Sequence, residues 1–209
     1  MGTKREKIVL IGGGGHAHSV VDAIERMGQY EIAGFIDQEP STSYKSYSTI
    51  GSDDDLDAIF KSGITLAAIT VGYLGRSRLR ETLFCKAKSI GFTFPPIIDP
   101  SAVVANDAII GEGSFVGKLA VVNANAHVGS MNIVNTGAII EHDCRLGDYS
   151  HVAVNATLCG SVDAGEFVFV GANAVVVQGV SLGDFSLIGA GAVVLKDVEE
   201  HQRAVGIHD

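Results

Sequence analysis

The stretch IEHDCRLGDYSHVAVNATL, residues 140–158, shows the pattern that decides the fold of more than half of the chain. An aliphatic side chain returns at every sixth position, as at Ile140, Leu146, Val152 and Leu158. The same spacing extends from residue 98 to residue 194, over seventeen positions of which sixteen are β-branched or leucine. Mostly small side chains recur four residues after these positions, and glycine often follows them directly. This part of the sequence is a run of hexapeptide repeats.

A period of six does not match an α-helix, whose apolar positions recur every three or four residues. A β-sandwich would require alternation of apolar and polar residues, which the hexads lack. We therefore predict a β-solenoid in which three hexads form one coil and each aliphatic residue stacks on the one eighteen residues later. Short parallel strands would form the sides, small residues would fill the corners, and glycine would take strained backbone positions.

The composition excludes several classes of protein. The chain has 209 residues, and 46% hydrophobic residues exclude a disordered chain. With 15 basic and 24 acidic residues, its net charge of -9 argues against binding to nucleic-acid phosphates. The apolar run at residues 8–11 is too short for a secretory signal, and no run is long enough to span a membrane. The cysteines Cys85, Cys144 and Cys159 lack CxxC spacing, so we expect neither disulfides nor a cysteine zinc site. This cysteine usage predicts a cytoplasmic protein.

Residues 7–96 follow a different pattern. Apolar runs at 8–11, 32–36 and 66–71 alternate with helix-like stretches at about 17–27, 53–60 and 77–88. This alternation is typical of βαβ units around a small parallel sheet. We predict an α/β, Rossmann-like domain over residues 1–96 and the solenoid over residues 97–209, with prolines at 95, 96 and 100 at the junction.

A glycine-rich turn, GGGGHA at residues 12–17, separates the first predicted strand from the first predicted helix. Such a turn presents backbone N–H groups and a helix N-terminus to a phosphate. Asp37 ends the next strand, about where a carboxylate can hold a ribose hydroxyl. About 90 residues are half of a dinucleotide-binding fold, so a mononucleotide or nucleotide-linked sugar fits better. The alternative is a turn that only packs the helix against the sheet.

Glu141, His142 and Asp143 directly follow an inward position of the predicted solenoid. A carboxylate beside a histidine orients the ring and stabilises its protonated form, which suits a general base. Charged residues at a solenoid corner also serve solubility alone. Gly160 lies eighteen residues after His142, so we expect its backbone N–H one coil further on, about 4.8 Å along the axis, facing the group that His142 deprotonates.

Two further features concern an elongated ligand. Ala172 and Ala190 are themselves eighteen residues apart, and we expect them to continue the ladder of Gly160 along the corner that such a ligand would follow. His151 lies nine residues, half a coil, after His142. The two histidines should therefore meet only across an oligomer interface.

Three further stretches stand out beside the glycine turn and Asp37: VG at 71–72, RE at 80–81 and NTGAIIEHDCRLGDYSHVAVNATLCGSV at 135–162. Together, these features resemble the sugar O- and N-acetyltransferases of the left-handed β-helix superfamily. This group includes sialic-acid O-acetyltransferases and the acetyltransferases of nucleotide-linked 4-amino-4,6-dideoxysugars. The resemblance covers nearly the whole chain and implies a left-handed coil and a homotrimer. The chain departs from the family at VGIHD, residues 205–209, where members usually continue past VG-x-P-A-K.

The resemblance also implies roles for individual residues. His142 is the general base, and Asp143 raises its basicity. His151, Ala172 and Ala190 contact acetyl-CoA, and Gly160 joins them as the predicted N–H donor. The positions that hold the nucleotide sugar are Gly14, Gly15, His16, Asp37 and Gly72.

We therefore predict transfer of acetyl from acetyl-CoA, as co-substrate, to the amino group of a nucleotide-linked 4-amino-4,6-dideoxysugar for bacterial surface glycans, without a metal. Transfer to a sialic-acid-like hydroxyl, and a non-catalytic nucleotide-sugar-binding protein, are the alternatives. An acyl intermediate on Cys144 or Cys159 is a variant of the mechanism. Zinc-dependent hydration would need His127, His142 and His151 around one ion, although their spacing places them on different sides of the coil. A nicotinamide oxidoreductase would rest on the glycine turn alone.

Overall fold

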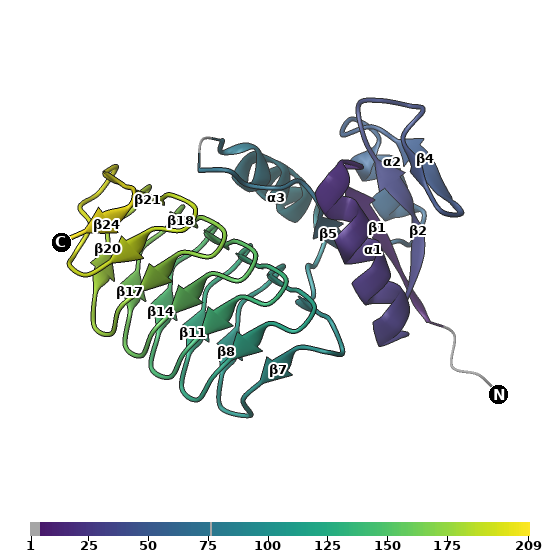
Figure 1. Ribbon diagram of the computed structural model, residues 1–209. Coiled ribbons are helices and arrows are strands. Elements are labelled where there is room, and N and C mark those ends of the chain that lie inside the picture. Colours follow the sequence, from purple (N-terminus) through teal and green to yellow (C-terminus); the bar gives the residue numbers. More distant parts are fainter. Residues whose placement is uncertain (1–4, 76) are drawn as a thin grey trace. The chain divides into compact units, whose positions relative to one another are not determined.

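The computed structural model describes residues 5–75 and 77–209 of the chain. Contacts divide it into two compact units (Figure 1). The first comprises the described residues up to Gly72 together with Arg78–Ile97, and the second comprises Tyr73–Ser77 and Ile98–Asp209. The excursion at Tyr73–Ser77 has no counterpart in the prediction from the sequence.

The first unit is built on a five-stranded sheet of order β3-β4-β2-β1-β5. β1, β2, β4 and β5 are parallel, and β3 joins β4 in an antiparallel hairpin. The element bounds are β1 Glu6–Ile11, α1 Gly15–Met27, β2 Tyr30–Ile36, β3 Ser43–Tyr44, β4 Tyr47–Gly51, α2 Leu56–Lys61, β5 Leu66–Ile69 and α3 Leu79–Ile90.

The hydrophobic pattern explains most of these elements. β1 pairs on both sides, so its residues 8–11 are almost fully buried. α1 buries one face, including Val20 and Ile24, and ends at Gly28, which has the left-handed φ of 66° that favours glycine. The three predicted strands and three predicted helices are all present. The β3–β4 hairpin is additional, and its half-exposed strands lack a buried run that the sequence could reveal.

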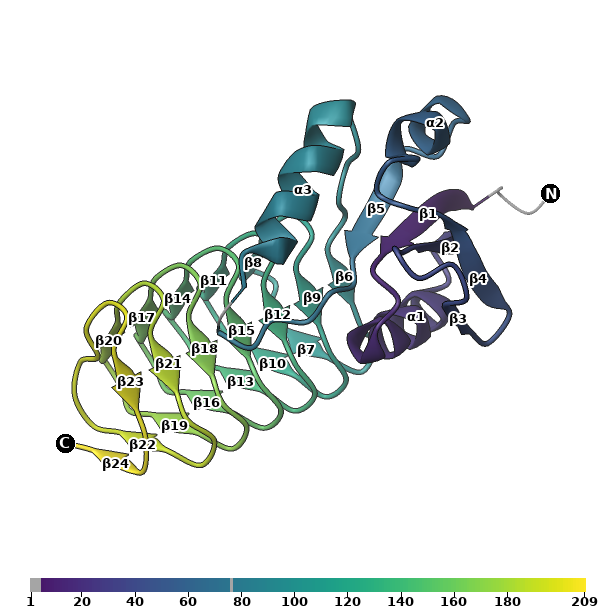
Figure 2. The same cartoon turned by 90° about the horizontal axis from the view of Figure 1, so that it is seen from above.

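The second unit is a solenoid of two-residue strands, seen along its length in Figure 1 and from another side in Figure 2. Each coil is three-sided, and strands eighteen residues apart pair in register, as Val134 does with Val152. The bounds are β6 Ile97–Ile98, β7 Val103–Val104, β8 Ile109–Ile110, β9 Phe115–Val116, β10 Val121–Val122, β11 His127–Val128, β12 Ile133–Val134, β13 Ile139–Ile140, β14 Arg145–Leu146, β15 His151–Val152, β16 Thr157–Leu158, β17 Asp163–Ala164, β18 Phe169–Val170, β19 Val175–Val176, β20 Ser181–Leu182, β21 Leu187–Ile188, β22 Val193–Val194, β23 Arg203–Ala204 and β24 Ile207–His208.

The second residue of most strands points into the solenoid and forms its core, as Val134, Val152 and Val170 do with 0% exposure. This inward ladder is the hexad pattern of the sequence. The corners between strands hold small buried side chains such as Ala156. The predicted solenoid and its eighteen-residue coil are therefore confirmed.

The first residue of each strand points outward and gives the three sides different surfaces. The strap face consists of β6, β9, β12, β15, β18, β21 and β23, the apolar face of β7, β10, β13, β16, β19, β22 and β24, and the polar face of β8, β11, β14, β17 and β20. Outward residues of the apolar face are Val103, Val121, Ile139, Thr157, Val175, Val193 and Ile207. Those of the polar face are Ile109, His127, Arg145, Asp163 and Ser181.

A strap, residues 73–75 with 77, packs on the strap face. The Tyr73 hydroxyl donates a hydrogen bond of 2.6 Å to the carbonyl of Phe167, and burial raises the pKa of Tyr73 to about 12. Gly75 has a φ of 78°, and a Cβ there would lie 3.1 Å from Leu187 and 3.2 Å from Phe169. Only glycine lets the strap come this close to the solenoid in this conformation.

Candidate active site

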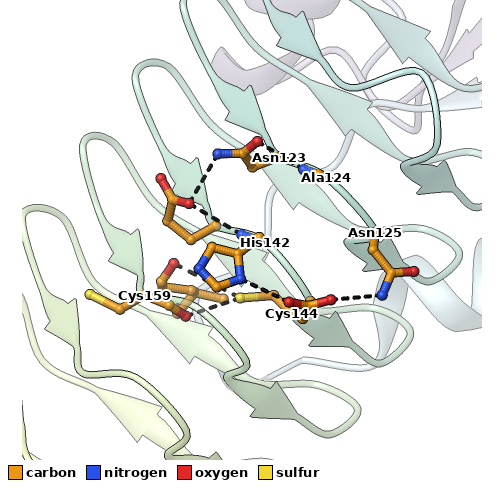
Figure 3. Close-up of polar contacts among 9 residues, drawn as sticks. Asn123, Ala124, Asn125, His142, Cys144 and Cys159 are labelled. Atoms are coloured by element: carbon orange, nitrogen blue, oxygen red, sulfur yellow. Dashed lines mark hydrogen bonds and ion pairs between the residues drawn. The ribbon is translucent and has the colours of Figure 1, made fainter.

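His142 lies at the corner between the apolar face and the polar face, here called the His142 edge (Figure 3). Its side chain is 51% exposed, and its Nδ1 lies 2.8 Å from Asp143 Oδ2. Because a carboxylate accepts, Nδ1 carries the proton of a neutral ring and Nε2 keeps its lone pair. In the described part of the chain, Nε2 has no hydrogen-bond partner. The ring is therefore oriented as a general base with its basic nitrogen accessible.

Two asparagines on the preceding coil hold the acids on either side of His142. Asn125 Nδ2 donates to Asp143 Oδ1 at 2.7 Å, and Asn123 Nδ2 donates to Glu141 Oε2 at 3.0 Å (Figure 3). The hydrogen bond from Asn125, followed by that from His142, lowers the pKa of Asp143, so this carboxyl is ionised at neutral pH. Neither asparagine was predicted from the sequence, although each lies eighteen residues before its acid.

Gly160 lies on the following coil against the His142 ring. A Cβ at Gly160 would lie 2.6 Å from both Cε1 and Nε2 of His142, so this position must be glycine for the ring to stay where it is. Across the described residues, the neighbouring Cys159 and Ser161 N–H groups are paired with backbone carbonyls, whereas no such bond is formed by the Gly160 N–H. The eighteen-residue spacing thus brings Gly160 to His142, and the Gly160 N–H is the one amide of this turn without a backbone partner among the described residues.

The two cysteines near this corner differ in burial. Cys144 is fully buried, its Sγ lies 3.1 Å from the carbonyl of Cys159, and burial raises the pKa of its thiol. A thiol of this kind is a poor nucleophile, because the thiolate is the reactive form. Cys159 is half-buried beside Gly160. The geometry therefore favours direct attack over an acyl intermediate on Cys144.

The expected ladder from Gly160 to Ala172 and Ala190 is wrong. These alanines lie in the turns after β18 and β21, at the corner between the strap face and the apolar face, here called the Ala172 edge. The eighteen-residue series of His142 and Gly160 continues instead through Gln178. The error arose because twelve residues, two sides of the coil, separate Gly160 from Ala172. Their predicted contact with acetyl-CoA stays a prediction.

His151 points outward from β15 on the strap face, where the strap leaves it only 7% exposed. Its Nδ1 lies 2.6 Å from the carbonyl of Tyr73, so Nδ1 carries the proton of the neutral ring. Nε2 then accepts from Asn135 Nδ2 at 3.2 Å. As expected, His151 does not meet His142 within one chain. Its role toward acetyl-CoA stays a prediction.

The zinc alternative receives no support from the positions of its histidines. His127 lies on the polar face, His142 at a corner and His151 on the strap face. Within residues 5–75 and 77–209, no group of three or more histidine, cysteine or acidic side chains is arranged to hold a metal ion.

In the first unit, the glycine turn separates into two halves with different surroundings. A Cβ at Gly12 would lie 2.6 Å from Val71, and one at Gly13 would lie 2.0 Å from Thr42, so these glycines permit close packing. Gly14 and Gly15 are exposed with nothing within 4 Å of such a Cβ. They begin α1, whose N-cap Gly14 provides no side-chain cap. Open space and uncapped N–H groups at a helix N-terminus suit a phosphate.

The other predicted nucleotide-sugar residues surround this turn. A Cβ at Gly72 would lie 3.9 Å from the Cβ of His16, so these two residues are neighbours. Asp37 accepts from the backbone N–H of Gly13 at 2.6 Å and from that of Glu39 at 2.9 Å. The carboxylate of Asp37 therefore shapes the turn, and its remaining lone pairs are what a ribose hydroxyl would use.

The comparisons with known proteins agree with these features. The family model of the PglD N-terminal domain matches residues 7–87, and that of the hexapeptide repeat of succinyl-transferase matches residues 164–196. A search of curated proteins found no match.

Several solved structures are similar over nearly the whole chain. PerB from Caulobacter crescentus, in complex with CoA and GDP-perosamine, is 36% identical with a TM-score of 0.90, covering 96% of this chain and 94% of that one. A mutant of perosamine N-acetyltransferase from the same organism is 35% identical with a TM-score of 0.91, covering 96% and 93%. The acetyltransferase domain of PglB from Neisseria gonorrhoeae, with acetyl coenzyme A, is 32% identical with a TM-score of 0.90, covering 97% of each chain.

These similarities confirm the predicted family and fold class, including the left hand of the solenoid. None of the helices in the described part of the chain combines the length and apolar character needed to cross a bilayer. The chain belongs to the left-handed β-helix sugar N-acetyltransferases, the family of PerB and of the acetyltransferase domain of PglB.

Proposed function

We propose that this protein transfers the acetyl group of acetyl-CoA to the amino group of a nucleotide-linked 4-amino-4,6-dideoxysugar used in bacterial surface glycans. The observation that carries the proposal is the His142 corner, where Asp143 holds Nδ1, Nε2 has no hydrogen-bond partner among the described residues, and Gly160 lies against the ring. The nucleotide sugar and coenzyme bound by PerB support the substrate class.

In the proposed reaction, the amine nitrogen attacks the thioester carbonyl directly. A sugar amine is mostly ammonium at neutral pH, so it first releases one proton to solvent, and the neutral amine then attacks. His142 Nε2 takes the second proton from the amine nitrogen as the C–N bond forms. The negative charge that develops on the carbonyl oxygen would be stabilised by the Gly160 N–H. When the C–S bond breaks, the CoA thiolate leaves and receives the proton from His142, which restores the neutral ring.

The glycine turn would hold the nucleotide part of the acceptor. Gly14 and Gly15 leave room for phosphates at the start of α1, while His16, Asp37 and Gly72 border the same space. Acetyl-CoA would lie along the solenoid, in contact with His151, Gly160, Ala172 and Ala190. Because acetyl-CoA and nucleotide sugars are cytoplasmic metabolites, the enzyme would act in the cytoplasm.

The active form would be a homotrimer whose sites lie between subunits. The apolar face exposes Val103, Val193 and Ile207 by 64%, 36% and 70%, although such a row of side chains is ordinarily covered. His142 and Gly160 border this face on one side, and Ala172 and Ala190 border it on the other. A neighbouring copy packed on the face would bring the Ala172 edge of one subunit to the His142 edge of another.

The direct test is mass spectrometry after incubation with acetyl-CoA and a panel of acceptors. Nucleotide 4-amino-4,6-dideoxysugars should gain one acetyl group, whereas the corresponding 4-hydroxy sugars and free sialic acids should not. Acetylation of a hydroxyl, with the amine left unmodified, would contradict the proposal.

A further inference from the structure

We infer that Asn125 is a positioning residue for the acetyl transfer, because it holds Asp143 in the orientation that aligns His142. The inference rests on the proposed function and adds a residue to it. Asn125 Nδ2 donates to Asp143 Oδ1 at 2.7 Å, while Asp143 Oδ2 lies 2.8 Å from His142 Nδ1. The three side chains form one continuous chain of hydrogen bonds across two coils of the solenoid (Figure 3).

Asp143 needs such a partner because its surroundings restrain it little. Its side chain is 50% exposed, and it projects from a corner where its φ is 61°. A solvent-exposed carboxylate rotates about its side-chain bonds and exchanges hydrogen bonds with water. Since Asn125 uses the one oxygen that His142 does not, both carboxylate oxygens are fixed at once, and the plane that faces His142 is defined.

The corresponding pair on the other side of His142 has a different effect. Asn123 donates to Glu141 Oε2, and that oxygen also lies 3.2 Å from the backbone N of His142. This pair holds the main chain of the corner. The orientation of the imidazole ring depends instead on Asp143, and therefore on Asn125.

The backbone alone does not account for an asparagine at this position. Asn125 has a φ of 56°, a left-handed conformation that asparagine tolerates. The same place in the corner, eighteen residues apart along the chain, is occupied by Asp143, Ser161 and then Gly179, which has a φ of 75°. Glycine is therefore compatible with this corner, and Asn125→Gly removes the amide without imposing backbone strain.

The experiment is steady-state kinetics of Asn125→Gly in the full chain, with an amino sugar that the native protein acetylates. We expect kcat to fall about 10-fold while KM for both substrates stays within about twofold, because the variant disturbs only the base. The control is His201→Gly, which removes an exposed side chain of the same left-handed conformation, φ 60°, from the corner between the polar face and the strap face, and should leave kcat unchanged.

A double-mutant cycle separates positioning from a general structural effect. If Asn125 acts through Asp143, adding Asn125→Gly to Asp143→Asn should lower kcat by less than about twofold. An equal loss in both backgrounds, or no loss in the native background, would overturn the inference. Should Asn125→Gly fail to fold, Asn125→Asp serves instead. It retains the left-handed conformation but places a like charge beside Asp143, and should lower kcat at least as much.

Failure of the inference is distinguishable from failure of the proposed function. If His142→Ala abolishes turnover while Asn125→Gly has no effect, only the role of Asn125 is wrong. If His142→Ala turns over normally, the proposed base is wrong, and the role of Asn125 falls with it.

Discussion

At the scale of single residues, the site depends on which ring nitrogen of His142 is bonded and on the space around the ring. Asp143 occupies Nδ1, and the glycine at position 160 leaves space for the ring. His142 Nε2 and the Gly160 N–H, neither of which has a hydrogen-bond partner among the described residues, lie at the same corner. Two predictions follow from this arrangement, one for the base and one for the space that it requires.

His142→Ala should lower kcat by roughly 10²-fold or more, the usual scale for removing a general base, with little change in KM for either substrate. Asp143→Asn should cost less, because a poorly oriented imidazole is still a base. His151→Ala should act chiefly through the affinity for acetyl-CoA. Steady-state kinetics of the three variants checks the order. Near-normal turnover of His142→Ala, with loss of turnover in Cys159→Ala, would instead assign the chemistry to a thiol.

Gly160→Ala should lower kcat because the added methyl group would lie 2.6 Å from His142 and must displace the ring. The backbone tolerates alanine at the middle of a corner, as at Ala124 and Ala172, so the fold should remain intact. The control is the same change in His142→Ala, where no ring is left to displace and no further loss is expected. A further loss in that background would show that Gly160 acts independently of His142.

At the scale of elements, the three sides of the solenoid have different surfaces. The strap covers one side, the polar face carries charged residues, and the apolar face is a continuous row of aliphatic side chains with one threonine. The hexads alone do not distinguish these sides, because all three share the inward aliphatic residue. The three sides differ in the outward residue, which directly precedes the inward aliphatic residue in each strand.

Val175→Arg should dissociate the proposed trimer, because burying an unpaired guanidinium in an apolar interface costs several kcal/mol. Val175 is an outward residue of β19, an interior strand of the apolar face. Ser181→Arg adds the same side chain to the exposed outward position of β20 on the polar face and should leave the assembly unchanged. Light scattering at the assay concentration measures both. A native protein that is fully active as a monomer would refute the trimer.

Tyr73→Phe should weaken the strap at neutral pH by about 1 kcal/mol, since the carbonyl of Phe167 loses its donor. The pKa of Tyr73 is raised to about 12 in the folded protein, so its contribution is complete below pH 10 and is lost as the pH rises toward 12. The stability difference between native and variant should therefore shrink over this interval. Urea unfolding at pH 8 and pH 11 tests this, and a constant difference would contradict the role of burial.

At the scale of the whole molecule, the two compact units carry chemically different sites. The first offers a helix N-terminus with open space, and the second offers the proposed base His142 with Gly160 against its ring. This division predicts that the binding of the two substrates can be impaired separately.

Gly14→Leu should abolish nucleotide-sugar binding and leave acetyl-CoA binding unchanged in calorimetry. Gly14 has φ -73° and ψ -174°, which any residue adopts, so leucine fills the space in front of α1 without backbone strain. Ala172→Leu is the reciprocal variant and should weaken acetyl-CoA binding alone. If Gly14→Leu weakens acetyl-CoA and not the nucleotide sugar, the assignment of substrates to units is reversed.

The sequence by itself determined the repeat of the solenoid and the glycine turn. The hexad spacing specifies the solenoid, because an inward residue that returns at every sixth position stacks on the one eighteen residues later. The same arithmetic brings Gly160 to His142. The glycine turn specifies the start of α1, because its N–H groups and open space are properties of consecutive residues.

Only the tertiary structure decided which side chains meet across the corners and sides. Asn125 aligns with Asp143 because side-chain direction at a left-handed corner is not visible in a spacing. Ala172 lies away from Gly160 because twelve residues cover two of the three sides of a coil and therefore end at a different corner. Tyr73 holds His151 from 78 residues away, through a contact between a strap and a coil that share no sequence pattern. Such contacts depend on how separate segments pack, and packing is a property of the folded chain.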